Sequence, residues 1–568
     1  MRGYGKECLL GPLFKLLEAT FELFIPLVVA SIVDDGILHS DNGYVMKMCG
    51  VMISLGIIGL ICAVTAQYFA ARAAVGFSCR LRHAVLSHIL GLSYSQIDRL
   101  GTSTMVTRMT ADIEQVQNGV NLTLRLLLRS PFVVFGAMIM AFTIDVQSAL
   151  VFVAVIPILC VIVFGIMLIT MPMHKRVRAA LDKVTSATRQ NLAGVRVIRA
   201  FCKEDSEVEA FRENTDELAR KQHTAGSISG LMDPITFVVV NVGIIVLVKI
   251  GAIKVEGGIL TQGLVIALYN YMSQILVELI KMANLIVSMT KAAACADRIA
   301  DVLDLEPDQK NGTKDTSALR ARIEFDDVTV RYSASGTPSL AGVSFTAEPG
   351  HTVGIIGGTG SGKTTLVNLI PRLYDVFSGK VMIDGVDVQE YDMNALRQSI
   401  GIVPQNAVLF KGTIRENLLW GNRDATDEEL WAALETAQAR EVVKDKDGEL
   451  DAPVEQGGVN FSGGQRQRLT IARALVRRPK ILILDDSASA LDYATDAAFR
   501  KAIRSMEEPP TTFIVSQRAA SVRFADQIIV LDDGMMVGKG THEELLAGNA
   551  VYREVYYSQF PKEVTDRG

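Results

Sequence analysis

The sequence predicts a multi-domain membrane protein in which a six-helix α-helical transmembrane domain precedes an α/β P-loop domain. Apolar residues form 49% of the 568-residue chain and are concentrated in its first half. Six apolar runs there approach or exceed the roughly 20 residues that cross a bilayer. The second half carries a G-x-x-x-x-G-K-[ST] pattern. One hydrophobic core does not support a chain of this length, so we expect a transmembrane domain over 1–297, a linker over 298–320 and a P-loop domain over 321–568.

The connections between the six runs differ sharply in charge. Those after the second and fourth runs are rich in Lys and Arg, whereas residues 34–43 and 145–148 contain neither and the fifth connection contains only Lys254. By the positive-inside rule, we expect the chain to lie in the inner (cytoplasmic) membrane. Its termini, both long connections and the P-loop domain would then face the cytoplasm. The first run is too long for the core of a cleavable signal peptide. The expected spans cover residues 9–33, 44–75, 119–143, 149–171, 231–252 and 264–289.

The two long connections are longer than a hairpin needs. We expect them to reach the P-loop domain, with turns near residues 92–94 and 193–195 as the contacting tips. The alternative is a solvated helical stalk.

Charged residues fall inside the expected spans, where each is costly unless it faces protein or water. They are spaced three or four residues apart, which places each pair on one helix face. One interpretation is a substrate pathway with charged walls. The alternative is a set of interhelical ion pairs, or groups near the interface that reach water. The pairs are Glu18 with Glu22, Arg125 with Arg129, and Glu278 with Lys281.

Composition excludes other classes of protein. The net charge of -5 gives no broad basic face, so we expect no nucleic-acid partner. The seven cysteines are scattered and lack the spacing of a zinc site, and we expect neither structural zinc nor disulfides.

The P-loop pattern lies between an apolar strand-like run, 353–356, and a helix-like run, 366–370. This is the context in which glycines let backbone N–H groups surround phosphates. The pattern predicts that ATP and Mg²⁺ bind here, with a point charge from Lys363 and a metal-ligand hydroxyl from Thr364. The predicted phosphate-binding residues are Gly357, Thr359, Gly360, Ser361, Gly362, Lys363, Thr364 and Thr365.

Further motifs follow in order along the second half. Gln405 ends the run Ile-Val-Pro-Gln, Ser462-Gly463-Gly464-Gln465 leads into a helical run, and an apolar strand over 481–484 ends in Asp485 and Asp486. Ser489-Ala490-Leu491-Asp492 comes shortly afterwards.

These motifs, in this order after six spans, closely resemble the ATP-binding cassette (ABC) family, and specifically its exporter-type half-transporters. The resemblance covers essentially the whole chain and makes the P-loop domain an ABC nucleotide-binding domain. It implies a dimer of cassettes with two ATP molecules between them, each held by one chain's phosphate loop and the other chain's Ser462–Gln465 segment.

The resemblance also implies individual roles. Tyr332 resembles the aromatic residue that stacks on adenine, although a tyrosine that ends a strand is also ordinary core. Gln405 resembles the residue that links Mg²⁺ and the attacking water to the membrane contacts, and Asp485 would hold the metal through water. Ser462, Gly463, Gly464 and Gln465 would bind the γ-phosphate of the opposite site.

The sequence departs from the family at two catalytic positions. Asp486 stands where the family usually has the glutamate base, and Gln517 replaces the switch histidine. A side chain one methylene shorter falls about 1.5 Å short, and misplacement by about an ångström can cost ~100-fold in rate. Glutamine cannot carry a titrating proton. We therefore expect the chain's own site to hydrolyse ATP poorly and its signature segment to complete the site of a second, non-identical half-transporter.

The function expected is ATP-driven transport of a small amphipathic or peptide-like solute, by export, as one subunit of a bacterial heterodimeric multidrug-like transporter. An importer of a metal-siderophore-type solute on the same fold is one alternative. The other is a membrane-embedded ATP-dependent switch that moves no solute.

Overall fold

The computed structural model describes residues 3–332, 336–487 and 491–560. The chain forms two compact units. The first comprises Met1–Leu90 and Thr102–Leu305, and the second comprises Gly91–Gly101 and Glu306–Gly568. Each unit is described by itself.

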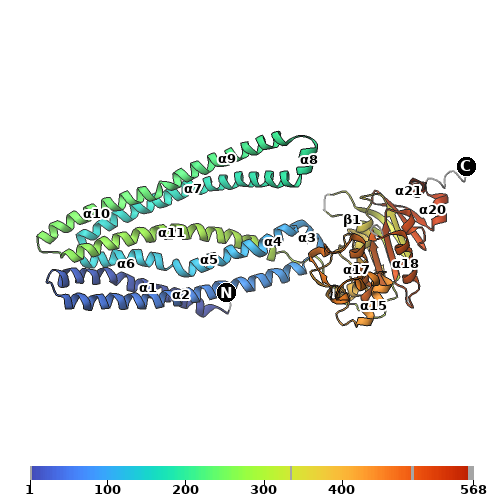
Figure 1. The fold of residues 1–568 in the computed structure, drawn as a ribbon, viewed down its shortest axis with the longest axis horizontal. Coiled ribbons are helices and arrows are strands. Elements are labelled where there is room, and N and C mark those ends of the chain that lie inside the picture. Colours follow the sequence, from blue (N-terminus) through green and yellow to red (C-terminus); the bar gives the residue numbers. More distant parts are fainter. Residues whose placement is uncertain (1–2, 333–335, 488–490, 561–568) are drawn as a thin grey trace. The chain divides into compact units, whose positions relative to one another are not determined.

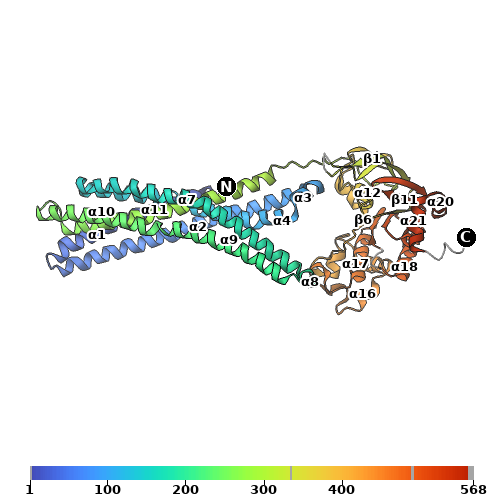
Figure 2. The same cartoon turned by 90° about the horizontal axis from the view of Figure 1, so that it is seen from above.

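The first unit is helical throughout (Figures 1 and 2). Within the part of the chain that the structure describes, six helical stretches are long and apolar enough to cross a membrane, which confirms the six spans predicted from sequence. The stretches are Gly5–Ile37, Asn42–Gly91, Thr102–Ile144, Val146–Ala193, Glu204–Glu256 and Gln262–Leu303. Their elements are α1 (Gly5–Ser31), η1 (Ile32–Ile37), α2 (Asn42–Gly91), α4 (Thr102–Thr107), η2 (Arg108–Asp112), α5 (Ile113–Leu126), α6 (Arg129–Ile144), α7 (Val146–Ala193), α8 (Val195–Ala200), α9 (Glu204–Gly230), α10 (Met232–Glu256) and α11 (Gln262–Leu303).

Several helices extend well beyond the spans. The turns expected near 92–94 and 193–195 lie where α2 and α7 end, and α7 packs along α9 in both views (Figures 1 and 2). The linker was predicted to begin at residue 298, but α11 continues to Leu303. Ile299 and Val302 are buried there, so apolar packing keeps helical a stretch whose polar composition predicted a linker.

The third span is interrupted between α5 and α6. Pro131 lacks a backbone N–H, so it cannot donate a hydrogen bond to the preceding turn. The interruption separates Arg125 from Arg129, which the sequence had placed on one helix face. Only Arg129 of the two is buried.

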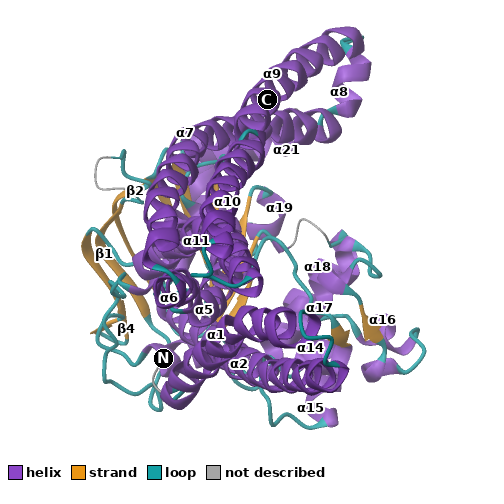
Figure 3. Cartoon of the chain, turned by 90° about the vertical axis from the view of Figure 1, so that its left-hand side faces the viewer, coloured by secondary structure: helices purple, strands orange, loops and turns teal. Residues whose placement is uncertain are grey.

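Every described strand belongs to the second unit (Figure 3). A six-stranded sheet has the order β12-β11-β3-β10-β9-β6, and a four-stranded antiparallel sheet has the order β2-β1-β4-β5. All neighbours in the larger sheet are parallel except β12 and β11. The strands are β1 (Ile323–Val330), β2 (Leu340–Ala347), β3 (Thr352–Gly357), β4 (Ser378–Ile383), β5 (Val386–Asp387), β6 (Ile400–Val403), β9 (Ile481–Asp485), β10 (Thr511–Ser516), β11 (Gln527–Asp532) and β12 (Met535–Gly540), with β7 (Gly412–Thr413) and β8 (Pro453–Val454) paired separately.

Two hydrophobic cores lie on the larger sheet. One includes stacked Phe325 and Phe345 and joins it to the four-stranded sheet, and the other packs helices against it. Every residue of β9 is buried, as expected for a parallel strand covered on both faces. The helices are α12 (Lys363–Leu369), α13 (Met393–Gln398), α14 (Ile414–Leu418), α15 (Asp427–Thr436), α16 (Arg440–Lys444), α17 (Gly463–Val476), α18 (Tyr493–Arg504), α19 (Ala519–Val522), α20 (His542–Gly548) and α21 (Ala550–Gln559), with short η3 (Glu449–Asp451) and η4 (Gln456–Gly458).

A short helix from the first half of the chain belongs to the second unit. It is α3 (Tyr94–Leu100), which begins with a capping box at Ser93. Gln96 donates to the carbonyl oxygen of Glu306 at 2.7 Å, and the Tyr374 hydroxyl donates to Asp98 at 2.6 Å. The first expected tip therefore does contact the P-loop domain. The division into units differs from the predicted domains in two ways, because residues 91–101 belong to the second unit and the first unit continues to Leu305.

Candidate nucleotide-binding site

The predicted site residues follow neighbouring strands of the larger sheet. The order β3-β10-β9-β6 is parallel, so the carboxyl ends of these four strands meet at one edge. The phosphate loop follows β3, Gln517 follows β10, Asp485 ends β9 and Gln405 follows β6. In open α/β sheets this edge is where ligands bind. The topology thus gathers residues that are far apart in the sequence.

The phosphate loop requires its glycines for different reasons. A Cβ on Gly357 would lie 2.2 Å from the Leu531 carbonyl oxygen, and one on Gly362, which has φ +92°, would lie 2.6 Å from the Ser339 oxygen. These two glycines allow the backbone to approach its neighbours closely. A Cβ on Gly358 would meet no atom within 4 Å, so it would point into open space. The loop therefore has a packed side and an open side, as a phosphate cradle requires.

Lys363 extends across this loop. Its ammonium group donates to the carbonyl oxygens of Gly357 at 2.9 Å and Gly358 at 2.5 Å. Burial lowers the pKa of Lys363, and the carboxylates of Asp486 and Asp485 oppose that shift. A buried cation beside open backbone suits a polyanionic phosphate chain, so the residues present fit ATP.

Thr364 and Asp485 form the pair predicted to hold metal. The Thr364 hydroxyl donates to Asp485 at 3.2 Å. Burial, together with the adjacent charge of Asp486, raises the pKa of Asp485 above the usual aspartate value, although Thr364 and Lys363 act in the opposite direction. A hydroxyl and a carboxylate are ligands that Mg²⁺ accepts when phosphate oxygens and water complete its octahedron. The pair therefore fits Mg²⁺.

Asp486 and Gln517 lie at the ends of adjacent strands. Val515 pairs with Asp485 in the register of β10 and β9, and the backbone N–H of Asp486 donates to the Val515 carbonyl oxygen at 3.0 Å. Asp486 has φ 47°, a left-handed conformation that aspartate adopts more readily than most residues. Gln517 is exposed. The two departures from the family pattern therefore follow adjacent strands at one end of the sheet, and Asp486 lies near Lys363.

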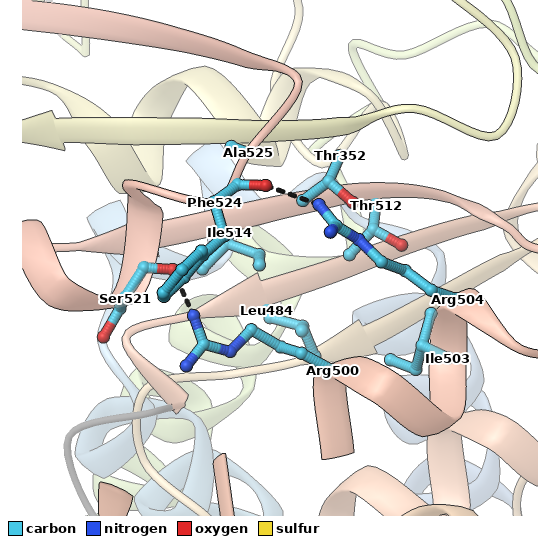
Figure 4. Close-up of a pocket in the computed structure, with 10 residues that line it drawn as sticks. All are labelled: Thr352, Leu484, Arg500, Ile503, Arg504, Thr512, Ile514, Ser521, Phe524 and Ala525. Carbon is cyan, nitrogen blue, oxygen red and sulfur yellow. Dashed lines mark hydrogen bonds between the residues drawn. The ribbon is translucent and has the colours of Figure 1, made fainter. Parts of the chain in front are cut away.

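Side chains on α18 hold the segment that follows Gln517. Arg500 and Arg504 donate to the carbonyl oxygens of Ser521 and Phe524 (Figure 4). The cavity that they line encloses about 20 Å³, which suffices for one water molecule at most. Its role is structural, and it is too small for a ligand.

Tyr332 lies against the helix of the phosphate loop. Its hydroxyl is 2.9 Å from the Thr365 hydroxyl, and the residue is 52% exposed. Tyr374 packs edge-to-face on it with centroids 5.1 Å apart. With about half of the residue exposed, Tyr332 can stack on a base. Tyr374 and its bond to Asp98 were missed from sequence, where no pattern marked them.

The Ser462–Gln465 segment forms the N-terminus of α17. Ser462 and Gln465 make a capping box, with Gly463 exposed between them. α17 packs against α14, α15 and β6, whereas the phosphate-loop helix α12 packs against β3, β9 and β10. Gln405 is exposed, as are Ser462 and Gly463. The Ser489–Asp492 motif falls partly outside the described residues, and Asp492 caps α18.

Comparison with known proteins identifies both halves of the chain. Residues 8–279 match the family model of the ABC transporter transmembrane region, and residues 340–489 match that of the ABC transporter. An uncharacterised ABC transporter ATP-binding protein of Mycobacterium tuberculosis is 37% identical over 567 residues, covering 98% of this chain and 97% of the relative. YfiB of Bacillus subtilis, similarly described, is 36% identical, covering 96% and 95%. An ATP-dependent lipid A-core flippase of Yersinia pestis is 27% identical, covering 98% and 96%.

Proposed function

Because the chain belongs to the ABC transporter family, as a fused exporter-type half-transporter with an ATPase coupled to transport, we propose that it acts as one subunit of a heterodimer. Its own phosphate-loop site would bind ATP and Mg²⁺ but turn ATP over slowly. Its Ser462–Gln465 segment would complete a competent site on a different half-transporter. The chain would lie in the inner membrane with both termini in the cytoplasm.

The observation that carries this proposal is the pairing of Asp486 with Gln517 at one sheet edge. Asp486 lies near Lys363 and directly follows the Asp485 that bonds to Thr364, and Gln517 follows the adjacent strand β10. The shorter carboxylate reaches the water poorly, and the glutamine supplies hydrogen bonds but no titrating group. Nucleotide binding is thereby retained while hydrolysis is impaired.

An intact signature segment beside an impaired site favours unlike subunits. Two copies of this chain would combine two slow sites, whereas a partner with glutamate and histidine at the matching positions would restore one fast site.

The solute proposed is small and amphipathic or peptide-like, and it would be exported. The relative named as an ATP-dependent lipid A-core flippase supports an amphipathic solute, since the similarity covers nearly the whole of both chains. An importer would move solute across the vesicle membrane in the direction opposite to that of an exporter. A switch that moves no solute would hydrolyse ATP at a rate that no solute changes.

The test is ATP hydrolysis by the purified full chain in lipid nanodiscs, alone and with a half-transporter that carries the glutamate and histidine. We expect slow ATP turnover by the chain alone and at least ~100-fold faster ATP turnover in the mixed dimer. Asp486→Glu with Gln517→His should raise the rate of the chain alone, whereas Lys363→Ala should abolish nucleotide binding to it. Fast, transport-coupled turnover by the unmodified chain alone would refute the heterodimer.

A further inference from the structure

A polar cavity opens between α1 and α11 in the membrane-spanning part of the first unit. It encloses about 500 Å³, within the ~300–1,000 Å³ typical of small-molecule pockets. One wall is a face of α11 on which polar residues recur at helical spacing, and α1 supplies a carboxylate and two apolar side chains opposite. The polar lining residues are Glu22, Asn270, Ser273, Gln274, Glu278 and Lys281.

Both cations at this cavity are held in ion pairs: Arg129, which is not part of the lining, and Lys281, which is. Arg129, whose side chain is 7% exposed, donates to Glu22 and to Glu278 at 2.5 Å each. Glu278, 4% exposed, also accepts from Ser130 and Lys281 at 2.8 Å. Arg129 is therefore committed to two carboxylates and is not presented to the cavity. An anionic ligand would have to compete with Glu22 and Glu278 for Arg129, and with Glu278 for Lys281.

Two side chains of the lining carry hydrogen-bond acceptors that the described residues do not saturate. The side chain of Glu22 is 36% exposed on the cavity wall. The Oε1 atom of Gln274 is buried and has no hydrogen-bond partner among the described residues. A buried acceptor without a donor is unfavourable, and a donor from a ligand would remove that cost. Both groups require an N–H or O–H, and Glu22 also favours positive charge.

We propose that this cavity binds the protonated amine of an amphipathic solute, with its ammonium group donating to Glu22 and Gln274. The apolar part would lie on Ile25, Pro26 and Val277, which complete the lining. Lys281, further along α11 and paired with Glu278, disfavours a second cation on the same molecule. This inference rests on the proposed transport function and names its solute class.

The test uses three dansyl probes on the same five-carbon chain, ending in ammonium, trimethylammonium or carboxylate. Their binding to the full chain in nanodiscs is followed by dansyl fluorescence, and empty nanodiscs correct for partition into lipid. The ammonium probe should bind saturably, at least tenfold more tightly than either of the others. Equal affinity for the ammonium and trimethylammonium probes, or no saturable binding of the ammonium probe, would overturn the proposal.

Substitutions in the cavity lining test where the ammonium probe binds. Glu22→Gln should weaken ammonium binding at least tenfold, Glu22→Asp should retain most of it, and Gln274→Leu should reduce the preference for ammonium over trimethylammonium. Glu213→Gln, on exposed α9, is the matched control and should change nothing. Gln274 lies outside the ion pairs, so Gln274→Leu still tests whether the cavity is the binding site if Glu22→Gln does not fold. Unchanged probe binding in Gln274→Leu rejects the cavity, whereas the heterodimer is judged separately by ATP turnover.

Discussion

The side chain of Gln559, at the end of α21, is bonded to the backbone around Gln517. Its amide nitrogen donates to the Gln517 carbonyl oxygen at 2.9 Å, and its amide oxygen accepts from the Ala519 N–H at 2.8 Å. One side chain from the last described helix thus fixes the backbone on both sides of Arg518. It positions Gln517, the residue that we propose stands in place of the family's switch histidine.

Loss of this contact should slow hydrolysis without loss of binding. Gln559→Leu removes both hydrogen bonds, each contributing about 0.5–1.5 kcal/mol, and frees the segment to shift. In the Asp486→Glu, Gln517→His background we expect the turnover rate to fall about tenfold. ATP affinity, measured with a fluorescent nucleotide, should stay within about twofold. Ser558→Ala, which removes only a local bond to Val555, should leave the rate intact.

The glycines of the phosphate loop should separate into two classes. Gly357→Ala places a methyl group against the Leu531 carbonyl, and we expect a destabilisation of about 1–3 kcal/mol, measured by thermal unfolding. Gly358→Ala meets no protein atom and should leave the unfolding temperature unchanged. It should nevertheless weaken ATP binding, because its methyl group occupies the open side of the loop. Equal thermal effects of the two substitutions would contradict this division.

Tyr374 should control how firmly α3 is held. Its hydroxyl bond to Asp98 contributes to a pKa of Tyr374 well above the usual tyrosine value, after burial as the larger cause. Tyr374→Phe keeps the ring and removes the bond. Hydrogen exchange in residues 91–101 should become about tenfold faster, as expected for a bond to a charged group. Tyr391→Phe, which loses a bond to Ile383 elsewhere in the same unit, should leave that exchange unchanged.

The ion pair between Asp145 and Lys254 should stabilise the first unit. Lys254 donates to both carboxylate oxygens at 2.7 and 2.8 Å, and each side chain is 13% exposed. Burial would raise the pKa of Asp145, but bonds from Lys254 and Ser148 outweigh it and lower the pKa. The stabilisation is therefore present at neutral pH and disappears as acid protonates the carboxyl below its usual range.

Removal of one partner leaves the other charge buried. Lys254→Met should therefore cost about 3 kcal/mol of unfolding free energy, measured by denaturant titration in detergent. Adding Asp145→Asn should recover part of that loss. A double variant as unstable as the single one would show that Lys254 acts through its packing.

Sequence patterns predicted the parts of this molecule that local physics determines. Apolar runs gave the six spans, and the phosphate loop and Asp485 were each recognised as following a strand, whereas Gln517 was marked only by its likeness to the family's switch position. The sheet order then brought them to one edge, which no single segment encodes. Contacts between distant segments escaped prediction, because nothing in the local pattern at Gln559, Tyr374 or Asp98 distinguishes a surface residue from a bonded one. The end of α11 was misplaced for the same reason, since burial of Ile299 overrode its polar neighbours.

The inclusion of α3 in the second unit bears on how the cassette can be separated from its membrane half. A fragment cut at Glu306 would lack the helix on which Tyr374 and the Glu306 carbonyl depend, leaving a bare patch where α3 belongs. Truncated ATPase domains of this protein should therefore be prepared with a peptide of residues 91–101 supplied in trans. The same holds for chimaeras, because a cassette transplanted onto a foreign membrane half also requires a matching α3 from its host.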